Sequence, residues 1–367
     1  MSSTTMTMPA ATSSQAAPPV ALACGPVAID GRARTRWDDF VQGHRLGSVF
    51  HTSAWHDVVR ETFGHAPHYL QATRGRTMAG VLPLFLVKSK LAGRLLVSVP
   101  YGVAGGVLAD DQDAAEALIA AAKALVHKAG ASMLDLRSRE AVSPELVDVA
   151  RYANFERELP DGPGDVLAWL PRKARAAARN GRDKYELTVS WDVNDLPEVW
   201  RLYSINMRRI GSLAYPIEFL RRIVAHERLD AWVSLIRWRG EPAAGLLTLC
   251  HTDRVMPYFF GATDAARRCS AANFAYMTLM RRAIEHGYRV FDFGRSRVDN
   301  RGSYEFKRLH GFEPTPLRYQ CFVPEGRHAP NLSPSNPKFR LARRLWPRLP
   351  LKLTQYLGAR IARHVPG

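Results

Sequence analysis

Cysteine is scarce in this sequence, and the few cysteines present form no pattern. Cys24, Cys250, Cys269 and Cys321 include no Cys-x-x-Cys pair and no pair at the spacing of metal ligands. The simple interpretation is an intracellular protein with reduced thiols, which argues against a disulfide-stabilised secreted scaffold. The histidines within residues 51–68 also lack a metal-binding spacing, so we expect no metal site.

Long hydrophobic runs are absent as well. No apolar stretch reaches the length that a membrane-spanning helix needs. Residues 1–23 lack the basic start and the apolar centre of a signal peptide, so we expect residues 1–25 to form a disordered tail. We expect a cytoplasmic protein, and peripheral contact with the inner face of the cytoplasmic membrane stays open.

Acidic residues are also in short supply. The chain has 34 Asp and Glu against 51 Lys and Arg, which gives a formal net charge of +17. Such a charge favours polyanionic partners: nucleic acid such as tRNA, phosphorylated carriers or anionic membrane. Composition alone does not choose among them.

The charge imbalance is greatest near the end of the chain. Residues 326–367 contain nine Lys or Arg and no Asp or Glu, and Trp, Leu and Tyr are interleaved with the cations. This pattern predicts contact with anionic lipid through residues 338–363, with a disordered basic tail as the alternative. Pro347 and Pro350 argue against one continuous helix.

Two similar parts are present between these tails. Pro and Gly residues at 160–164 form the strongest break in the chain and divide it into residues 26–160 and 161–325. Each part mixes segments typical of strands and of helices, which include helices expected from Ser53 and over residues 112–129 and 272–287. The sequence therefore predicts a mixed α/β (α+β) fold.

The two parts resemble each other in detail. "TMAGVLPLF" is similar to "PAAGLLTLC", and "MLDLRSR" is similar to "VFDFGRSR". Asp135 and Asp292 are 157 residues apart, and Phe155 and Phe312 have the same separation. We infer a tandem duplication of one α/β unit.

A phosphate site is predicted where a strand over residues 255–261 leads through a polar loop into the helix over 272–287. The first backbone N–H groups of a helix have no partner within the helix and bind anions. Arg267 and Arg268 add positive charge to that loop, although two solvated surface arginines are an equal alternative. Ser270, Ala271 and Asn273 complete the candidate phosphate site. We expect Asn273 to be the N-cap of the helix more than a ligand.

The stretch "FDFGRSRVDNRGSYEFKRLHGF", residues 291–312, carries the candidate catalytic groups. Lys307 can stabilise negative charge on a carbonyl or a phosphate, and Tyr304 can donate a proton to a leaving group or simply pack. Arg295 and Ser296 follow a strand end, where α/β proteins collect ligands. Asp292 is a candidate base, but Asp135 occupies the same place in the first part, which favours a structural role.

The segment "LPRKARAAARNGRD" predicts a basic helix. Arg175 and Arg179 lie on one face of it at i, i+4, where they can contact a phosphorylated partner or face solvent. No convincing Ser/His/Asp or Cys/His set is visible. Catalysis would therefore depend on positioning and electrostatics rather than on a covalent enzyme intermediate.

These motifs together resemble two known families. Arg267–Ala272 is similar to the Arg/Gln-x-x-Gly-x-Gly/Ala loop of GNAT acyltransferases, with Ser270 where the first glycine belongs. Tyr304, Phe306 and Lys307 followed by Gly-Phe resemble the FemAB family of tandem-GNAT aminoacyltransferases, as does the basic helix. Residues 35–323 further resemble the FemAB-like subgroup associated with PEP-CTERM and exosortase exopolysaccharide loci, which usually has Trp where this chain has His310.

The resemblance implies two tandem GNAT-like domains, each a mixed sheet flanked by helices. It also implies that Lys307 lies against the donor, which is acyl-CoA or aminoacyl-tRNA. The expected function is transfer of an acyl or aminoacyl group to an amine or hydroxyl of a cell-envelope glycan or its lipid-linked precursor, in exopolysaccharide synthesis. Two alternatives are a tRNA-dependent peptidoglycan aminoacyltransferase and a non-catalytic membrane-associated scaffold.

Overall fold

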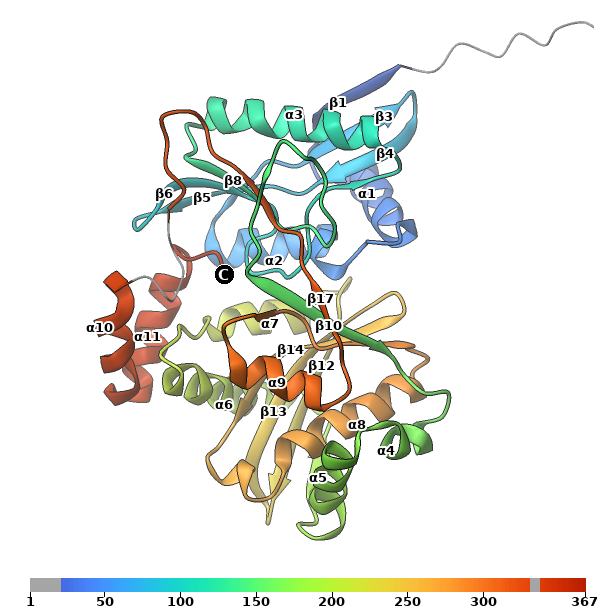
Figure 1. The fold of residues 1–367 in the computed structure, drawn as a ribbon, viewed down its shortest axis with the longest axis vertical. Helices are drawn as coiled ribbons and strands as arrows, with labels where there is room; N and C mark the ends of the chain where they lie inside the picture. The colour runs from blue at the N-terminus through green and yellow to red at the C-terminus, as the bar shows by residue number, and fades with distance from the viewer. Residues whose placement is uncertain (1–20, 331–336) are drawn as a thin grey trace, which may run out of the picture.

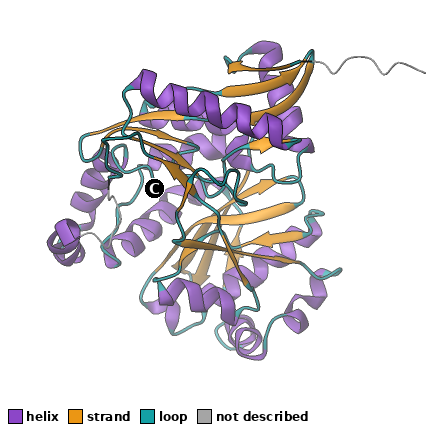
Figure 2. Ribbon diagram, turned by 45° about the horizontal axis from the view of Figure 1, so that its top comes forward, coloured by secondary structure: helices purple, strands orange, loops and turns teal. Residues whose placement is uncertain are grey.

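The computed structural model describes residues 21–330 and 337–367. Its two halves lie one above the other, the first half in blue and cyan and the second in yellow and orange (Figure 1). In each half, β-strands form sheets that are flanked by helices (Figure 2). The predicted mixed α/β fold is confirmed.

The helices and strands have the following bounds. The α-helices are α1 Gly31–Gly43, α2 Ser53–Phe63, α3 Gln112–Ala129, α4 Val166–Trp169, α5 Arg172–Asp183, α6 Leu196–Arg209, α7 Ile217–Ala225, α8 Ala271–Glu285, α9 Arg301–Leu309, α10 Pro337–Leu345 and α11 Leu351–Ala362. The 3-10 turns are η1 Val49–His51, η2 Pro163–Asp165, η3 Val193–Asp195, η4 Ala265–Arg267 and η5 Trp346–Arg348. The strands are β1 Leu22–Pro26, β2 Ala66–Pro67, β3 Leu70–Arg74, β4 Thr77–Leu82, β5 Phe85–Ser89, β6 Gly93–Val97, β7 Leu108–Ala109, β8 Met133–Leu136, β9 Val147–Asp148, β10 Tyr152–Glu158, β11 Thr188–Ser190, β12 Asp230–Trp238, β13 Glu241–His251, β14 Arg254–Ala262, β15 Val290–Asp292, β16 Ser296–Arg297, β17 Pro314–Pro316 and β18 Gln320–Phe322.

The two halves exchange their last strands. The sheet orders are β1-β3-β4-β7 and β2-β5-β6-β8-β18-β9 in the first half, and β11-β12-β13-β14-β15-β10-β16 in the second, where β17 also pairs with β10. β18 thus lies between β8 and β9, and β10 lies between β15 and β17. β10 and β17 lie side by side at the junction of the halves, and the chain after β17 runs up into the first half (Figure 1). The sheets therefore do not follow the sequence boundaries at residues 160 and 325, because β10 and β18 each complete the sheet of the other half.

This topology changes the alignment of the repeat. β8 and β15, which carry Asp135 and Asp292, occupy the same place, since each pairs in parallel with one strand of its own half (β6 and β14) and antiparallel with an exchanged strand. Phe155 lies within β10, whereas Phe312 precedes β17. Their equal spacing is therefore not a structural equivalence. Helix α9, inserted between β15 and β17, shifts the register after Asp292.

An aromatic core joins the halves. Phe219 of α7 packs on Trp55 and Phe63 of α2, at ring separations of 5.7 and 5.0 Å. Tyr101 of the first half lies 5.3 Å from Tyr215 of the second. Burial of such large aromatic side chains contributes strongly to stability, so the two halves form one packed body.

The sheet of the second half has helices on both faces. α6 crosses β14 so closely that a Cβ at Gly261 would lie 2.1 Å from the backbone nitrogen of Tyr203. Only glycine fits there. On the other face, the side chains of α8 form a second core with β13 and β14, and α5 packs beside α8 where Gly181 meets Phe274. This layering holds β14 and the start of α8 in fixed positions.

The expected disorder of residues 21–25, and the alternative of a disordered basic tail, are wrong for the residues described. Leu22–Pro26 form strand β1, paired antiparallel with β3, rather than part of a disordered tail; residues 1–20 lie outside the described residues. Beyond residue 336 the chain forms α10 and α11, separated near Pro347 and Pro350 as the prolines predict. Thr354, Gly358 and Ala362 form the buried face of α11. None of the described helices combines the length and apolar character needed to cross a membrane.

Candidate active site

β14 and β15 separate after a short parallel contact. They pair only at Arg254–Val290 and Val255–Phe291, although β14 continues to Ala262 beside β13. Beyond β15, the N–H of Phe293 donates to the carbonyl oxygen of Phe155 in β10, at 2.8 Å. The backbone along this edge of β14 is thus not paired with β15, and an extended amide-containing ligand can add to it.

The opening leads toward the start of α8. Ser270 is the N-cap residue, has φ of +59°, and makes no capping hydrogen bond with its side chain. This left-handed conformation suits glycine and costs a serine about 1 kcal/mol. Ala271 is buried, whereas Arg267 and Arg268 are exposed just before the helix. The uncapped N–H groups and the two cations make an anion-binding end.

Asn273 does not cap α8, so the prediction of an N-cap role is wrong. Its amide nitrogen lies 3.1 Å from Nε2 of His310, and Nδ1 of His310 lies 2.7 Å from the carbonyl oxygen of Phe306. Since a carbonyl only accepts, Nδ1 carries the proton and Nε2 accepts from Asn273. Burial lowers the pKa of His310 and keeps it neutral. Asn273 therefore fastens α9 to the first turn of α8.

Lys307 of α9 is buried beside this opening. Its Nζ donates to the carbonyl oxygens of Gly294 and Arg295, at 2.8 and 3.1 Å, and lies 5.2 Å from the ring centre of Phe155. Burial lowers the pKa of Lys307 to about 7, against the opposing effect of the Asp292 carboxylate. The structure thus places the amine of Lys307, with its pKa lowered by burial, against the turn that follows β15.

Asp292 is buried and both of its carboxylate oxygens are occupied. Oδ1 accepts from the N–H of Gly294 at 2.8 Å, and Oδ2 accepts from Nη2 of Arg139 at 2.9 Å. Arg139 also pairs with Glu156 of the exchanged strand β10. This geometry supports a positioning role for Asp292 and Arg139. Sequence reasoning missed Arg139, although the repeated "LRSR" and "GRSR" segments were a signal for it.

The other predicted residues of the 291–312 stretch lie close to Lys307 but are engaged. Nη1 of Arg295 donates to the Tyr319 hydroxyl at 3.1 Å, and its guanidinium lies 4.6 Å from the Tyr152 ring. The hydroxyl of Ser296 lies 2.8 Å from that of Ser303. Tyr304 packs edge-on against Phe155, at 5.0 Å, and lines a cavity of about 240 Å³ where the exchanged strands cross.

Helix α5 lies apart from Lys307. Nε of Arg175 donates to the carbonyl oxygen of Leu170, and Arg179 is exposed. The helix packs beside the first turn of α8 through Gly181 and Phe274. Its cations are therefore neighbours of the N-terminus of α8 rather than of Lys307.

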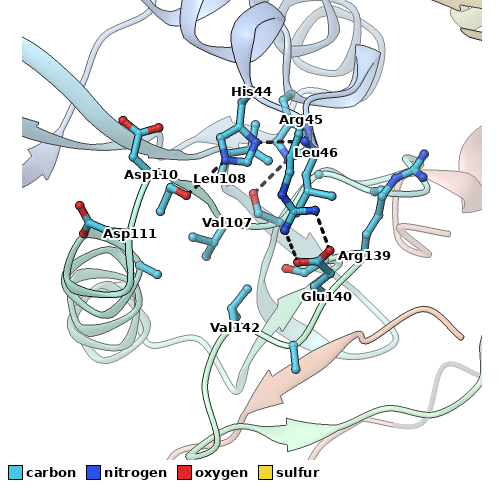
Figure 3. A pocket seen from close by; sticks show the side chains of 18 of the residues that line it. His44, Arg45, Leu46, Val107, Leu108, Asp110, Asp111, Arg139, Glu140 and Val142 are labelled. Atoms are coloured by element: carbon cyan, nitrogen blue, oxygen red, sulfur yellow. Dashed lines mark hydrogen bonds and ion pairs between the residues drawn. The ribbon is translucent and has the colours of Figure 1, made fainter. Parts of the chain in front are cut away.

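A larger cavity of about 470 Å³ lies in the first half, and sequence reasoning did not predict it. Figure 3 shows His44, Arg45, Asp110, Arg139 and Glu140 around it. Arg45 and Glu140 form two hydrogen bonds, at 2.9 and 2.7 Å, across one side. Arg139 lines this cavity while its guanidinium binds Asp292, so one residue connects the cavity to the Lys307 region.

No three His, Cys, Asp or Glu side chains within residues 21–330 and 337–367 are grouped as metal ligands would be. The chemistry that the described site can perform comes from Lys307, the α8 end and the open edge of β14.

Comparison with known proteins defines the class. Residues 166–308, which span α4 to α9, match the model of the acetyltransferase (GNAT) domain family. The crystal structure of FemX superposes with a TM-score of 0.63 at 16% identity, over 87% of this chain and 99% of that one. A tandem GNAT protein from the clavulanic acid biosynthesis pathway gives 0.52 at 14% identity, over 83% and 98%. The search of curated proteins found no match.

The chain therefore contains a GNAT acetyltransferase domain in its second half and has the fold of tandem GNAT proteins. The domain supports an acyltransferase that uses a donor of the acyl-CoA class. At these low identities, the structural similarity to FemX establishes the fold alone.

Proposed function

We propose that this protein is a FemAB-like acyltransferase that moves an acyl group from a CoA thioester to an amine of a cell-envelope glycan or its lipid-linked precursor. The observation that carries the proposal is Lys307, a buried lysine with a pKa of about 7 that is hydrogen-bonded to the Gly294 turn, which faces Met256 of β14. The sequence resemblance to exopolysaccharide-associated proteins suggests an exopolysaccharide precursor as the acceptor.

The donor would lie along β14. The amides of its pantetheine arm can pair with the unpaired edge of the strand, and its pyrophosphate can reach the N-terminus of α8. Arg267 and Arg268 would then neutralise the pyrophosphate charge. Ser270 has the backbone conformation of the glycine that it replaces, so the loop retains the shape needed for this contact.

Lys307 would stabilise the charge that develops on the carbonyl oxygen. Two of its three N–H groups, when it is protonated, are directed to the carbonyls of Gly294 and Arg295. The third remains for the oxyanion of the tetrahedral intermediate. The acceptor amine forms the new bond to the carbonyl carbon and loses a proton, and the thiolate leaves and is protonated.

The acceptor would enter from the first half. The cavity around His44, Asp110 and Arg139 is polar and large enough for a sugar-sized group. Arg139 connects its wall to Asp292, which holds the Gly294 turn that accepts from Lys307. Acceptor binding and the geometry of the catalytic lysine would thus be mechanically linked.

A thermal-shift titration with CoA, acetyl-CoA and longer acyl-CoAs tests the donor. Ligand that binds only the folded state raises the melting temperature by mass action. We expect a dose-dependent rise that is reduced in Arg267→Ala/Arg268→Ala. The matched control, Arg32→Ala/Arg76→Ala, removes the same charge from exposed positions of the first half and should leave the rise unchanged. No rise with any CoA species would contradict a CoA donor.

Aminoacyl-tRNA is the second candidate donor. Arg172, Lys173 and Arg179 of α5 are exposed, and α5 packs beside the first turn of α8, so more positive charge lies near the donor end than one pyrophosphate requires. Transfer that needs charged tRNA and is abolished by ribonuclease would establish this alternative. If neither donor binds and Lys307→Ala retains function in cells, the non-catalytic scaffold is the remaining explanation.

A further inference from the structure

Exposed apolar side chains are concentrated on α10, α11 and the turn between them. Leu341, Leu345, Leu353 and Tyr356 expose 68, 47, 40 and 52% of their surface. The other large exposed apolar residues of the described chain are scattered over both halves: Leu91, Val147, Val193, Ile210, Val298 and Leu309. We call the exposed side of residues 341–363 the tail surface.

The tail surface is also strongly cationic. Its exposed basic side chains include Arg344, Arg348, Lys352, Arg360 and Arg363. Elsewhere in the molecule many arginines pair with carboxylates, but within the described residues none of these five forms an ion pair. No Asp or Glu occurs between residues 326 and 367 to neutralise them.

The tail surface is held in a fixed orientation. Gly358 of α11 sits against Ala214, where a Cβ would lie 2.6 Å from the Ala214 carbonyl oxygen. Beyond the helix, the carbonyl oxygen of Pro366 accepts from the N–H of Tyr101 at 2.8 Å and from Arg137 at 3.0 Å. The face of α11 opposite these contacts displays Leu353, Tyr356 and Arg360 outward, which is the arrangement of an amphipathic helix lying on a surface.

We propose that the tail surface binds an anionic lipid membrane. The cations complement lipid phosphate, and the leucines and Tyr356 enter the boundary between headgroups and acyl chains. RNA would use the same cations but offers no acyl chains to exposed leucines, so the aliphatic component favours lipid. The inference goes beyond the proposed acyl transfer and does not depend on it. It would place the two halves at the surface where lipid-linked glycans reside.

Co-sedimentation with vesicles tests the proposal. The full chain is mixed with vesicles of phosphatidylcholine alone or of phosphatidylcholine with phosphatidylglycerol, and the bound fraction is measured as salt is raised. We expect binding to the anionic vesicles that weakens with salt, and little binding to phosphatidylcholine alone. Equal binding to both kinds of vesicle, or binding to neither, would overturn the proposal.

Two variants separate the apolar from the electrostatic contribution. Leu341→Ser/Leu345→Ser/Leu353→Ser keeps every charge, and Arg344→Gln/Arg348→Gln/Arg360→Gln keeps every leucine. Each should lower the partition coefficient at least about tenfold. The matched control, Leu91→Ser/Val193→Ser, removes exposed apolar side chains elsewhere and should have no effect. All these positions are exposed, so the melting temperature should confirm that the variants fold.

A competition experiment addresses RNA. If the leucine variant binds anionic vesicles as tightly as the wild type, and unfractionated tRNA displaces the wild type from them, the tail surface is an RNA-binding surface and the membrane proposal is wrong. If the leucine variant loses vesicle binding but keeps its affinity for tRNA, the apolar contribution is specific to lipid and the proposal stands.

Discussion

Helices α3 and α8 occupy the same place in the two halves, yet their N-termini differ in charge. The N-terminus of α3 is capped by a carboxylate, whereas that of α8 is uncapped and preceded by arginines. Asp111 caps α3 by accepting from the N–H of Ala114 at 2.9 Å, and Asp113 lies in its first turn. Ser270 at the start of α8 makes no such hydrogen bond, its first turn contains no acid, and Arg267 and Arg268 precede it.

A carboxylate that caps a helix satisfies the same N–H groups that would bind a phosphate, and it repels the anion. The comparison therefore teaches that the two halves have corresponding helix N-termini, and that one capping carboxylate is enough to close such an end to an anion. In the first half, the cavity of about 470 Å³ lies next to this capped helix.

The largest expected effect comes from removing the lysine that only the second half has after β15. Lys307→Met should lower the rate of acyl transfer by about 10²–10³, the range for loss of one oxyanion donor. Release of free CoA thiol from an acyl-CoA, with an amino sugar as acceptor, measures it. Lys128→Ala, an exposed lysine of the first half, is the control. An unchanged rate in Lys307→Met would contradict a catalytic role.

An acidic N-cap residue on α8, like that of α3, should weaken binding of CoA at the start of α8. Ser270→Asp places a carboxylate at the N-cap, which tolerates the left-handed conformation and competes with the pyrophosphate. We expect the Kd for CoA to rise about tenfold, consistent with helix-end charge effects of about 1–2 kcal/mol. Isothermal titration calorimetry measures the Kd, with Ser270→Asn as the uncharged control. Equal losses in both variants would mean that charge is not the cause.

The pH dependence of the reaction sharpens the role of Lys307. Because burial lowers its pKa to about 7, the fraction of Lys307 that carries the ammonium proton falls above that pH. The ratio of wild-type to Lys307→Met rates, in which ionisation of the acceptor cancels, should fall about tenfold per pH unit above 7. A ratio that rises instead would show that the neutral amine acts as a base.

The same pKa predicts how stability changes with pH. Between about pH 7 and 10.5 the unfolded lysine holds a proton that the folded lysine lacks, so stability rises with pH in that window. Relative to Lys307→Met, the gain is at most about 1.4 kcal/mol per pH unit. Urea denaturation of both proteins across this range measures it, and parallel curves would refute the lowered pKa.

The smallest effect is expected from removing the carboxylate that caps the N-terminus of α3. Asp111→Ser should cost about 1 kcal/mol of stability through the weaker cap and the lost pair with Arg74. It should create no CoA site, because Asp110 and Asp113 remain beside the helix start. Chemical denaturation measures the loss of stability, and calorimetry measures CoA binding. A second CoA site that appears in Asp111→Ser would show that the cap alone distinguishes α3 from α8.

Part of the fold could be predicted from local sequence. The helix expected to begin at Ser53 does so, capped by Thr52 and ended by Gly64 in the left-handed conformation, and the helix over residues 112–129 has the predicted bounds. Capping residues and hydrophobic periodicity act over a few neighbours, so they are visible in sequence. The sequence by itself also determined the mixed α/β class, the strand–loop–helix unit with Arg267 and Arg268, and the motif around Lys307.

Only the tertiary structure decided which strands pair across the duplication. Alternation of apolar and polar residues along β10 and β18 shows which face is buried but not which sheet receives the strand. Two copies of one unit offer equivalent sheets, so an exchanged strand has the same local pattern as one that stays. The ion pair between Arg139 and Asp292 depends on that exchange, because β10 brings Glu156 beside both halves.

The basic tail shows the same division between sequence and structure. Its charge and its break near the two prolines were determined by the sequence, since composition and proline geometry are local properties. Its docking against Ala214, Tyr101 and Arg137 was decided by the tertiary structure, because these partners lie more than a hundred residues away and no local pattern specifies them.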